Sequence, residues 1–351
     1  MIRIVTEANR FMNRLLFWLA CAAGAVPAML AAQAATAAEV NIYSHRQQFL
    51  LQPFLDAFTA ETGISTNVVY AAKGLAQRLQ AEGEASPADV ILTVDIARLS
   101  EYADLDLLAP VDSSVLAANI PANLRAGDDR WFAFSTRARL IAVSKDRVAE
   151  GAITDIEDLA DPKWAGTVCS RKGSHVYNRS LLASVIAANG ADAAEAWAEA
   201  MVANFARKPQ GNDRAQAKAI FEGQCDVAIM NHYYYGKMQF GDKEEQRDWA
   251  NAIRLVFTNQ SGRGNHVNIS GGGLAKHSPN REAAVRFLEF LTSPTAQQLY
   301  GEVNFEYPVN PAVSPGGVLS SWGDFKADDL AIEKLAELAP QAQMIIDRTG
   351  W

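Results

Sequence analysis

The chain has 351 residues, of which 49% are hydrophobic, and its formal net charge is −8 at pH 7. This acidic balance argues against nucleic acid or anionic lipid as a partner, because both bind basic surfaces. The length exceeds what one ordinary hydrophobic core holds, so it predicts two lobes or domains.

Residues 1–37 have the pattern of an exported protein. A basic start is followed by the apolar run "LLFWLACAAGAVPAMLAA" and then by the small residues "QAATAA". This order predicts a cleaved secretory signal, with cleavage after Ala37 or one position later. The rest of the chain has no apolar stretch of about 20 residues and is not expected to span a membrane.

Two cysteines, Cys169 and Cys225, remain after the leader. An even count in an oxidising compartment favours a disulfide. Each cysteine lies on a short apolar run, and we expect these runs to be neighbouring strands. Two buried free thiols are the alternative.

Short apolar runs alternate with helical patterns along the chain, which predicts an α/β fold with mixed or parallel sheets. The predicted strands are 40–44, 64–70, 88–95, 139–146 and 225–230, and the predicted helices are 52–63, 75–83, 153–166, 180–205 (broken at Asn189-Gly190) and 214–222, the last with Gly223 as its C-cap. The run 88–95 lacks alternation, as expected of a strand buried on both faces.

A strand over 266–270 runs directly into three glycines, Gly271 to Gly273. Their spacing does not match a phosphate-binding loop, so we expect close backbone packing at a crossover between lobes. Ser278 before Pro279 predicts one helix start, and Ser293 before Pro294 predicts the next.

The known motifs of hydrolytic and metal-dependent enzymes are absent from the sequence, and its five histidines are widely scattered. Ser174 and His175 are the nearest approach to a nucleophile with a base, but adjacent residues seldom serve each other in that way. We therefore predict no catalytic residue and a binding function. In α/β folds the ligand lies at the carboxyl ends of the strands.

Three consecutive tyrosines, Tyr233 to Tyr235, follow such a strand end in the segment "NHYYYGKM". Three adjacent rings cannot all face the same side of a helix or strand. A phenol ionises near neutral pH only beside a strong positive partner, because its ordinary pKa is about 10. A hard trivalent cation such as Fe(III) is a suitable partner. From residue types alone, ordinary packing of the rings remains the alternative.

An iron held by phenolates keeps open positions for an anion, which a guanidinium would hold. Candidates follow the first strand and lie in "FSTRARL": they are Arg46, Arg137 and Arg139.

Ten segments, in chain order, resemble the periplasmic ferric-iron-binding proteins of bacterial ABC importers. They are "VNIYSHRQ", "FTAETGI", "SPADVILTVDIARL", "WFAFSTRARLIAVSKD", "LADPKWAGTV", "VYNRSLLAS", "FARKPQGNDRAQAKAI", "NHYYYGKM", "NQSGRGNHVNISGGG" and "NREAAVRFLEFLTSPTAQQLY". The resemblance runs from about residue 39 to residue 310.

The resemblance implies a two-lobed solute-binding protein of type II, in which each lobe is a mixed, mostly parallel sheet flanked by helices. A ligand cleft separates the lobes. The implied boundaries are a signal peptide over 1–37, lobe 1 over 38–136 and 267–312, and lobe 2 over 137–266 and 313–351.

The resemblance also assigns site residues. It implies that Tyr177, Tyr233 and Tyr234 bind the iron as phenolates, whereas Tyr235 falls where the family often has an apolar residue. Arg46 and Arg137 are implied to hold a synergistic anion, expected to be carbonate.

The chain departs from one branch of this family, which has a histidine ligand after the first strand. Gln47 and Gln48 stand there instead, and His45 comes two residues too early. This points to the branch with three tyrosines and an anion. Tyr43, His45, Gln47 and Arg139 are expected around the ligands in supporting roles.

The expected function is extracytoplasmic binding of Fe(III) and its delivery to the membrane subunits of an ABC permease, by a monomer in the periplasm. A binding protein of the same fold for an organic anion, a polyamine or an iron chelate is the alternative.

Overall fold

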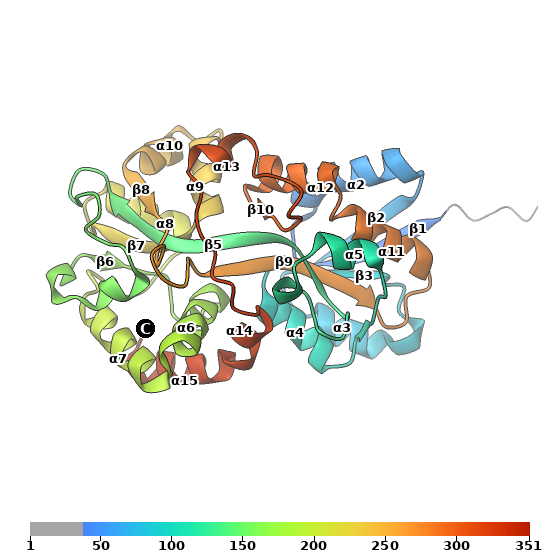
Figure 1. The fold of residues 1–351 in the computed structure, drawn as a ribbon, viewed down its shortest axis with the longest axis horizontal. Coiled ribbons are helices and arrows are strands. Elements are labelled where there is room, and N and C mark those ends of the chain that lie inside the picture. Colours follow the sequence, from blue (N-terminus) through green and yellow to red (C-terminus); the bar gives the residue numbers. More distant parts are fainter. Residues whose placement is uncertain (1–37) are drawn as a thin grey trace, which may run out of the picture. The chain divides into compact units, whose positions relative to one another are not determined.

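The computed structural model describes residues 38–351 (Figure 1), so the predicted signal peptide lies outside the described residues. The strands are β1 (Glu39–Ser44), β2 (Ser65–Tyr70), β3 (Val90–Thr93), β4 (Leu108–Ala109), β5 (Phe132–Ser144), β6 (Val168–Cys169), β7 (Val227–Asn231), β8 (Ile253–Val256), β9 (Val267–Ala275) and β10 (Tyr307–Pro308). The α-helices are α2 (Gln48–Thr62), α3 (Leu75–Glu82), α4 (Ile96–Asp104), α5 (Ser114–Asn119), α6 (Val176–Asn189), α7 (Ala191–Ala203), α8 (Asp213–Phe221), α9 (His232–Gln239), α10 (Glu244–Asn251), α11 (Arg281–Phe290), α12 (Pro294–Leu299), α13 (Gly317–Ser321), α14 (Glu333–Glu337) and α15 (Ala339–Thr349). Short 3₁₀ helices are η1 (Gly83–Ala85), η2 (Ala122–Leu124), η3 (Ile156–Ala160) and η4 (Pro162–Trp164), and η5 (Tyr300–Asn304) is a π-helical turn.

The strands form a mixed sheet system in the order β2-β1-β3-β9-β5-β7-β6. The α/β class is therefore confirmed. Parallel pairing is less extensive than predicted: it is found in β1 with β2, β1 with β3, and β6 with β7. The long strands β5 and β9 run antiparallel to their partners, and this makes the sheets more antiparallel than expected.

Strand β5 connects the two halves of the sheet system, and Figure 1 shows it crossing the middle of the fold beside β9. Its first part, through Ala138, pairs with β9. From Arg139 onward it pairs instead with β7, and β8 also joins this part. The sequence predicted this strand only from residue 139 onward. The preceding "FAFST" also belongs to β5, but no charged or turn-forming residue within it marks where a strand begins.

The three glycines lie in β9, where neighbouring strands leave no room for a side chain. A Cβ added at Gly271 would lie 2.5 Å from the carbonyl oxygen of Phe132. At Gly272 the corresponding distance to the oxygen of Ile91 is 2.2 Å. The prediction of close backbone packing at this segment is confirmed.

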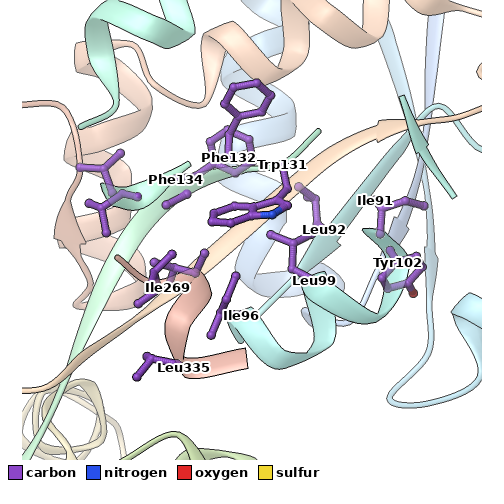
Figure 2. Packing of buried hydrophobic residues seen from close by; sticks show 14 of the residues in the cluster. Ile91, Leu92, Ile96, Leu99, Tyr102, Trp131, Phe132, Phe134, Ile269 and Leu335 are labelled. Atoms are coloured by element: carbon purple, nitrogen blue, oxygen red, sulfur yellow. The ribbon is translucent and has the colours of Figure 1, made fainter. Parts of the chain in front are cut away.

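A dense aromatic and aliphatic core fills the space between β9 and the helices beside it (Figure 2). Trp131 and Phe132 are buried here together with Ile96 and Leu99 of α4. Strand β3, the run predicted to be buried on both faces, has every residue buried. This core packs α4 against β3 and β9.

The segment 153–166, predicted as a short helix ending in a turn, forms the short 3₁₀ helices η3 and η4, with Pro162 at the first position of the second. Two local predictions were wrong. Ser278 does not cap α11: its hydroxyl donates to Asp89 at 2.7 Å, and the helix begins at Arg281. Helix α8 ends one residue earlier, with Glu222 as its C-cap. The start of α12 is as predicted, since the Ser293 hydroxyl accepts from the Ala296 N–H at 3.3 Å.

A disulfide joins Cys169 and Cys225, whose Cα atoms lie 5.9 Å apart. Cys169 ends β6, and Cys225 lies two residues before β7, the parallel neighbour of β6. The predicted pairing of neighbouring strands and the disulfide are both confirmed. Among residues 38–351, no helix combines the length and apolar character needed to cross a membrane.

We predict that Gly272→Ala destabilises the fold by about 1–3 kcal/mol, because the added methyl group must displace the Ile91 carbonyl. Urea unfolding followed by circular dichroism measures this change. Gly127→Ala is the control, since a Cβ there meets no atom within 4 Å. Equal stability of the two variants would contradict the crowding argument.

Candidate metal centre

Three tyrosine hydroxyls converge on one cleft. The Tyr233 hydroxyl donates to the Tyr177 hydroxyl at 3.2 Å, and the rings of Tyr233 and Tyr234 have centroids 4.4 Å apart. All three residues line a cleft of about 610 Å³. They come from two elements far apart in the chain, the first turn of α6 and the first turn of α9.

Helix α9 is held in place by buried contacts at its start. His232 is fully buried, and its Nδ1 accepts a hydrogen bond from the Ala138 N–H of β5 at 3.0 Å. Asn231, the last residue of β7, donates its side-chain N–H to the Tyr233 hydroxyl at 3.5 Å. These contacts direct Tyr233 and Tyr234 into the cleft. Tyr235 instead packs edge-on against Trp322, with ring centroids 5.5 Å apart.

Three guanidinium groups surround the ring of Tyr177. The central carbons of Arg137 and Arg171 lie 5.4 Å from the ring centroid, and that of Arg139 lies 5.9 Å away. Asp213 binds two of these groups, at 3.0 Å to Arg171 and 3.1 Å to Arg139. Tyr177 therefore lies among three guanidinium groups, two of which share one buried carboxylate.

Burial keeps the other two phenols protonated when no cation is bound. It raises the pKa of Tyr234 to about 12, with further increases from Tyr177 and Asp213. The pKa of Tyr233 is also raised well above 10, chiefly by burial and then by the charges of its tyrosine neighbours. A ligand that ionises these phenols must therefore carry a high positive charge.

Arg46 and Arg137, predicted to hold an anion, both line the cleft. Arg46 forms a buried ion pair with Glu306 at 2.8 Å and also donates to Ser270. Arg137 donates to the Ile269 carbonyl at 2.6 Å, while its Nε has no hydrogen-bond partner among the described residues. Each of these two arginines thus has one amino group engaged within the protein. The Nε–H of Arg137 remains as a donor for an anion.

Glu306 is the only carboxylate that lines the cleft within residues 38–351. Burial alone would raise its pKa, but the charges of Arg46 and Arg137 and a hydrogen bond from Ser135 outweigh burial. The pKa of Glu306 falls to about 2. Glu306 therefore stays ionised and holds Arg46 in place.

Three further cationic side chains, which the sequence did not point to, also line the cleft: they are Arg98, Arg214 and Lys237. Arg214 lies over the Tyr234 ring at 5.1 Å, and the Lys237 ammonium lies 5.6 Å from the Tyr233 ring centroid. Burial lowers the pKa of Lys237 to about 8. Lys237 follows Tyr233 by four residues, so the helical period could have placed them on one face.

The residues expected in supporting roles lie in different settings. His45 lines the cleft, but its Nδ1 is 2.9 Å from the Ala71 oxygen and its Nε2 is 2.8 Å from the Tyr102 hydroxyl. Gln47 also lines the cleft. The Tyr43 hydroxyl turns away and donates to Glu82 at 2.8 Å. Arg139 is buried behind Tyr177, where it also binds Asn231 at 2.8 Å.

His175 contacts both the backbone and the ring of Tyr177. Its Nδ1 accepts from the Tyr177 N–H at 3.3 Å at the start of α6, and its ring lies 4.6 Å from the Tyr177 ring. Burial, followed by the charges of Arg171 and Arg139, lowers the pKa of His175 to about 3. The ring is thus neutral at pH 7 and helps to orient Tyr177.

The chain belongs to the family of bacterial extracellular solute-binding proteins, whose model matches residues 43–298. Iron uptake protein A1 of Synechocystis is 43% identical over 89% of this chain and 87% of its own length. The ferric iron-binding protein A of Mannheimia haemolytica, solved in an open conformation, is 48% identical, with a TM-score of 0.85 over 90% of this chain and 99% of that one. A Trichodesmium protein in complex with iron and citrate ligands is 43% identical, with a TM-score of 0.86 over 89% of this chain and 99% of that one. The fold is thus that of a two-lobed, type II solute-binding protein.

We predict that Glu306→Gln destabilises the protein by about 3 kcal/mol at pH 7, because it leaves the buried Arg46 without its counter-ion. The folded-state pKa of Glu306 lies below its usual 4.5, so this stabilisation is present above about pH 4.5 and is lost as the pH falls towards 2. Urea unfolding at several pH values should therefore show the two proteins converging in acid. The exposed Glu302→Gln is the control, and a pH-independent difference would contradict this account.

Proposed function

We propose that this chain binds ferric iron through the phenolates of Tyr177, Tyr233 and Tyr234, together with an anion. The convergence of these hydroxyls under the charges of Arg137, Arg139 and Arg171 carries the proposal. Phenolate is a hard anionic oxygen ligand and suits a hard trivalent cation. The names of the relatives, which refer to iron uptake and ferric iron binding, support the same cargo.

The anion is proposed to lie beside Arg46 and Arg137, and carbonate is the expected species. The free Nε of Arg137 supports this placement. Citrate accompanies iron in the Trichodesmium structure, so a carboxylate is the natural competitor. Comparing the colour of the iron complex formed with bicarbonate and with citrate distinguishes them.

We place the lobe boundaries as the sequence suggested, with lobe 1 over 38–136 and 267–312 and lobe 2 over 137–266 and 313–351. The change of β5 partners between Ala138 and Arg139 supports a boundary in this strand. Closure of the lobes by a hinge motion would enclose the metal.

The proposed setting is the periplasm, where a cleaved signal over 1–37 would deliver a monomer. Its proposed partner is the membrane permease of an ABC importer, which would receive the iron. Reduction would release the metal, because Fe(II) is a softer cation than Fe(III) and binds phenolate less well. Loss of the anion would also release it.

Among the alternative ligands, the charge of the cleft favours an organic anion or an anionic iron chelate over a polyamine. In the described part of the chain, five cationic side chains line the cleft, and the one carboxylate that lines it is paired with Arg46. A polyamine would need converging carboxylates instead. The binding role assigns no catalytic function to Ser174 or His175.

We predict that ferric citrate added to the metal-free protein produces a visible tyrosinate-to-iron charge-transfer band. Replacing any one of the three tyrosine ligands by Phe should remove or strongly weaken it, because each substitution deletes one anionic ligand. Tyr235→Phe is the matched control and should keep the band, since this ring packs on Trp322. A missing band, or an unchanged one in Tyr234→Phe, would refute the assignment.

We predict that iron binding weakens in acid. The pKa of Tyr234 is about 12 and that of Tyr233 is above 10, so both phenols must release protons to coordinate. Affinity should fall by up to tenfold per pH unit for each proton released. The band should fade reversibly between pH 8 and pH 5 while circular dichroism stays constant. A band that persists with unchanged affinity across this range would exclude phenolate ligands.

A further inference from the structure

A second pocket adjoins the cleft and has its own cationic lining. It has a volume of about 520 Å³, and its cations are Lys73, Arg98 and Arg179. We call it the basic pocket. His45 and Arg98 line both the basic pocket and the cleft, so the two spaces are continuous.

The cations of the basic pocket act on the fold at a distance, since the charges of Arg98 and Arg179 favour the ionised form of the buried Asp95 carboxylate. Within residues 38–351, the side chains of Lys73, Arg98 and Arg179 form no hydrogen bond or ion pair. The Nε atom of Arg179 is buried without a partner. Elsewhere in the site, by contrast, Arg46, Arg139 and Arg171 are each paired with a carboxylate.

Few negative charges offset this lining. Among residues 38–351, Glu101 is the one carboxylate that lines the basic pocket, and it accepts a hydrogen bond from Gln77 at 3.1 Å. Asp95 is fully buried behind α4, where it accepts from the Ala97 N–H at 3.0 Å. The lining His45 has its pKa lowered, chiefly by burial, and adds no charge at pH 7.

The backbone adds donors to the same space. Helix α3 begins at the basic pocket with Gly74 as its N-cap, and no side chain accepts from its first N–H groups. The three cations come from three separate elements: the loop before α3, helix α4 and helix α6. A ligand with several anionic groups suits this arrangement, because the cations approach the pocket from three elements.

We propose that the basic pocket is a second anion site that binds an organic di- or tricarboxylate. Its volume lies in the range of sites for small organic molecules. Carboxylates form strong, charge-assisted hydrogen bonds with guanidinium groups such as those of Arg98 and Arg179. An anion with two or three carboxylates offers a separate group to each of the elements that carry these cations.

This site does not depend on iron and goes beyond the proposed function. The test is isothermal titration calorimetry of the metal-free protein with tricarballylate, a tricarboxylate without the hydroxyl group that strengthens iron chelation by citrate. We expect saturable binding, roughly tenfold weaker in Arg179→Gln and in Lys73→Gln, since each loses one charge-assisted contact. Inorganic phosphate should bind at least tenfold more weakly than tricarballylate.

Two controls locate the ligand. Lys172→Gln removes an exposed charge near the pocket that does not line it, and should leave the affinity unchanged. Arg214→Gln removes a cation that lines only the cleft, and should also leave it unchanged. A loss of affinity in Arg214→Gln but not in Arg179→Gln would place the anion in the cleft and overturn the proposal.

Absence of binding, or equal binding of phosphate, would also overturn the proposal. If Arg179→Gln does not fold, as judged by circular dichroism, Lys73→Gln decides, since its exposed side chain has no structural contact. The ferric charge-transfer band is recorded for both variants. A retained band with weakened tricarballylate binding supports two separate sites, so failure here is distinguishable from failure of the iron assignment.

Discussion

The buried carboxylate of Asp213 is the interaction on which the arrangement of the tyrosines depends. It binds Arg139 of β5, Arg171 before α6 and the backbone N–H of Asn231 at the end of β7, with distances from 2.8 to 3.1 Å. The segment with Arg171 and strand β7 lead directly into α6 and α9, the helices that carry the tyrosines of the cleft. Although burial alone would raise the pKa of Asp213, the charges of Arg139 and Arg171 hold it below its usual value. The carboxylate therefore stays ionised and compensates two arginines that would otherwise be unpaired.

The charge of the cleft is opposite to that of the chain as a whole. The formal net charge is −8, yet five cations line the cleft. A bare trivalent cation is repelled by these cationic side chains and binds the cleft weakly until the phenols ionise. Phenolates and an added anion would neutralise both the metal and the surrounding arginines, so metal and anion are expected to depend on each other.

Much of the fold could be predicted from local patterns. The uninterrupted apolar run of β3, the glycines of β9 and the spacing of short strands and helices all follow from rules that act over a few residues. The errors occur where a distant group competes with a local signal. Ser278 has the pattern of a helix cap, but its hydroxyl binds Asp89, which is 189 residues away in the chain.

The sequence by itself determined the α/β class, the cysteine pair and the tyrosine segment, because each is encoded by residue types at short spacing. Only the tertiary structure decided which cations face the cleft. Arg98 and Arg214 have no local signal that separates them from ordinary surface charges, and they reach the site because β5 and β9 bring distant segments together. The structure alone also shows which arginines are already paired, because a partner such as Glu306 lies 260 residues from Arg46 and no short-range pattern links them.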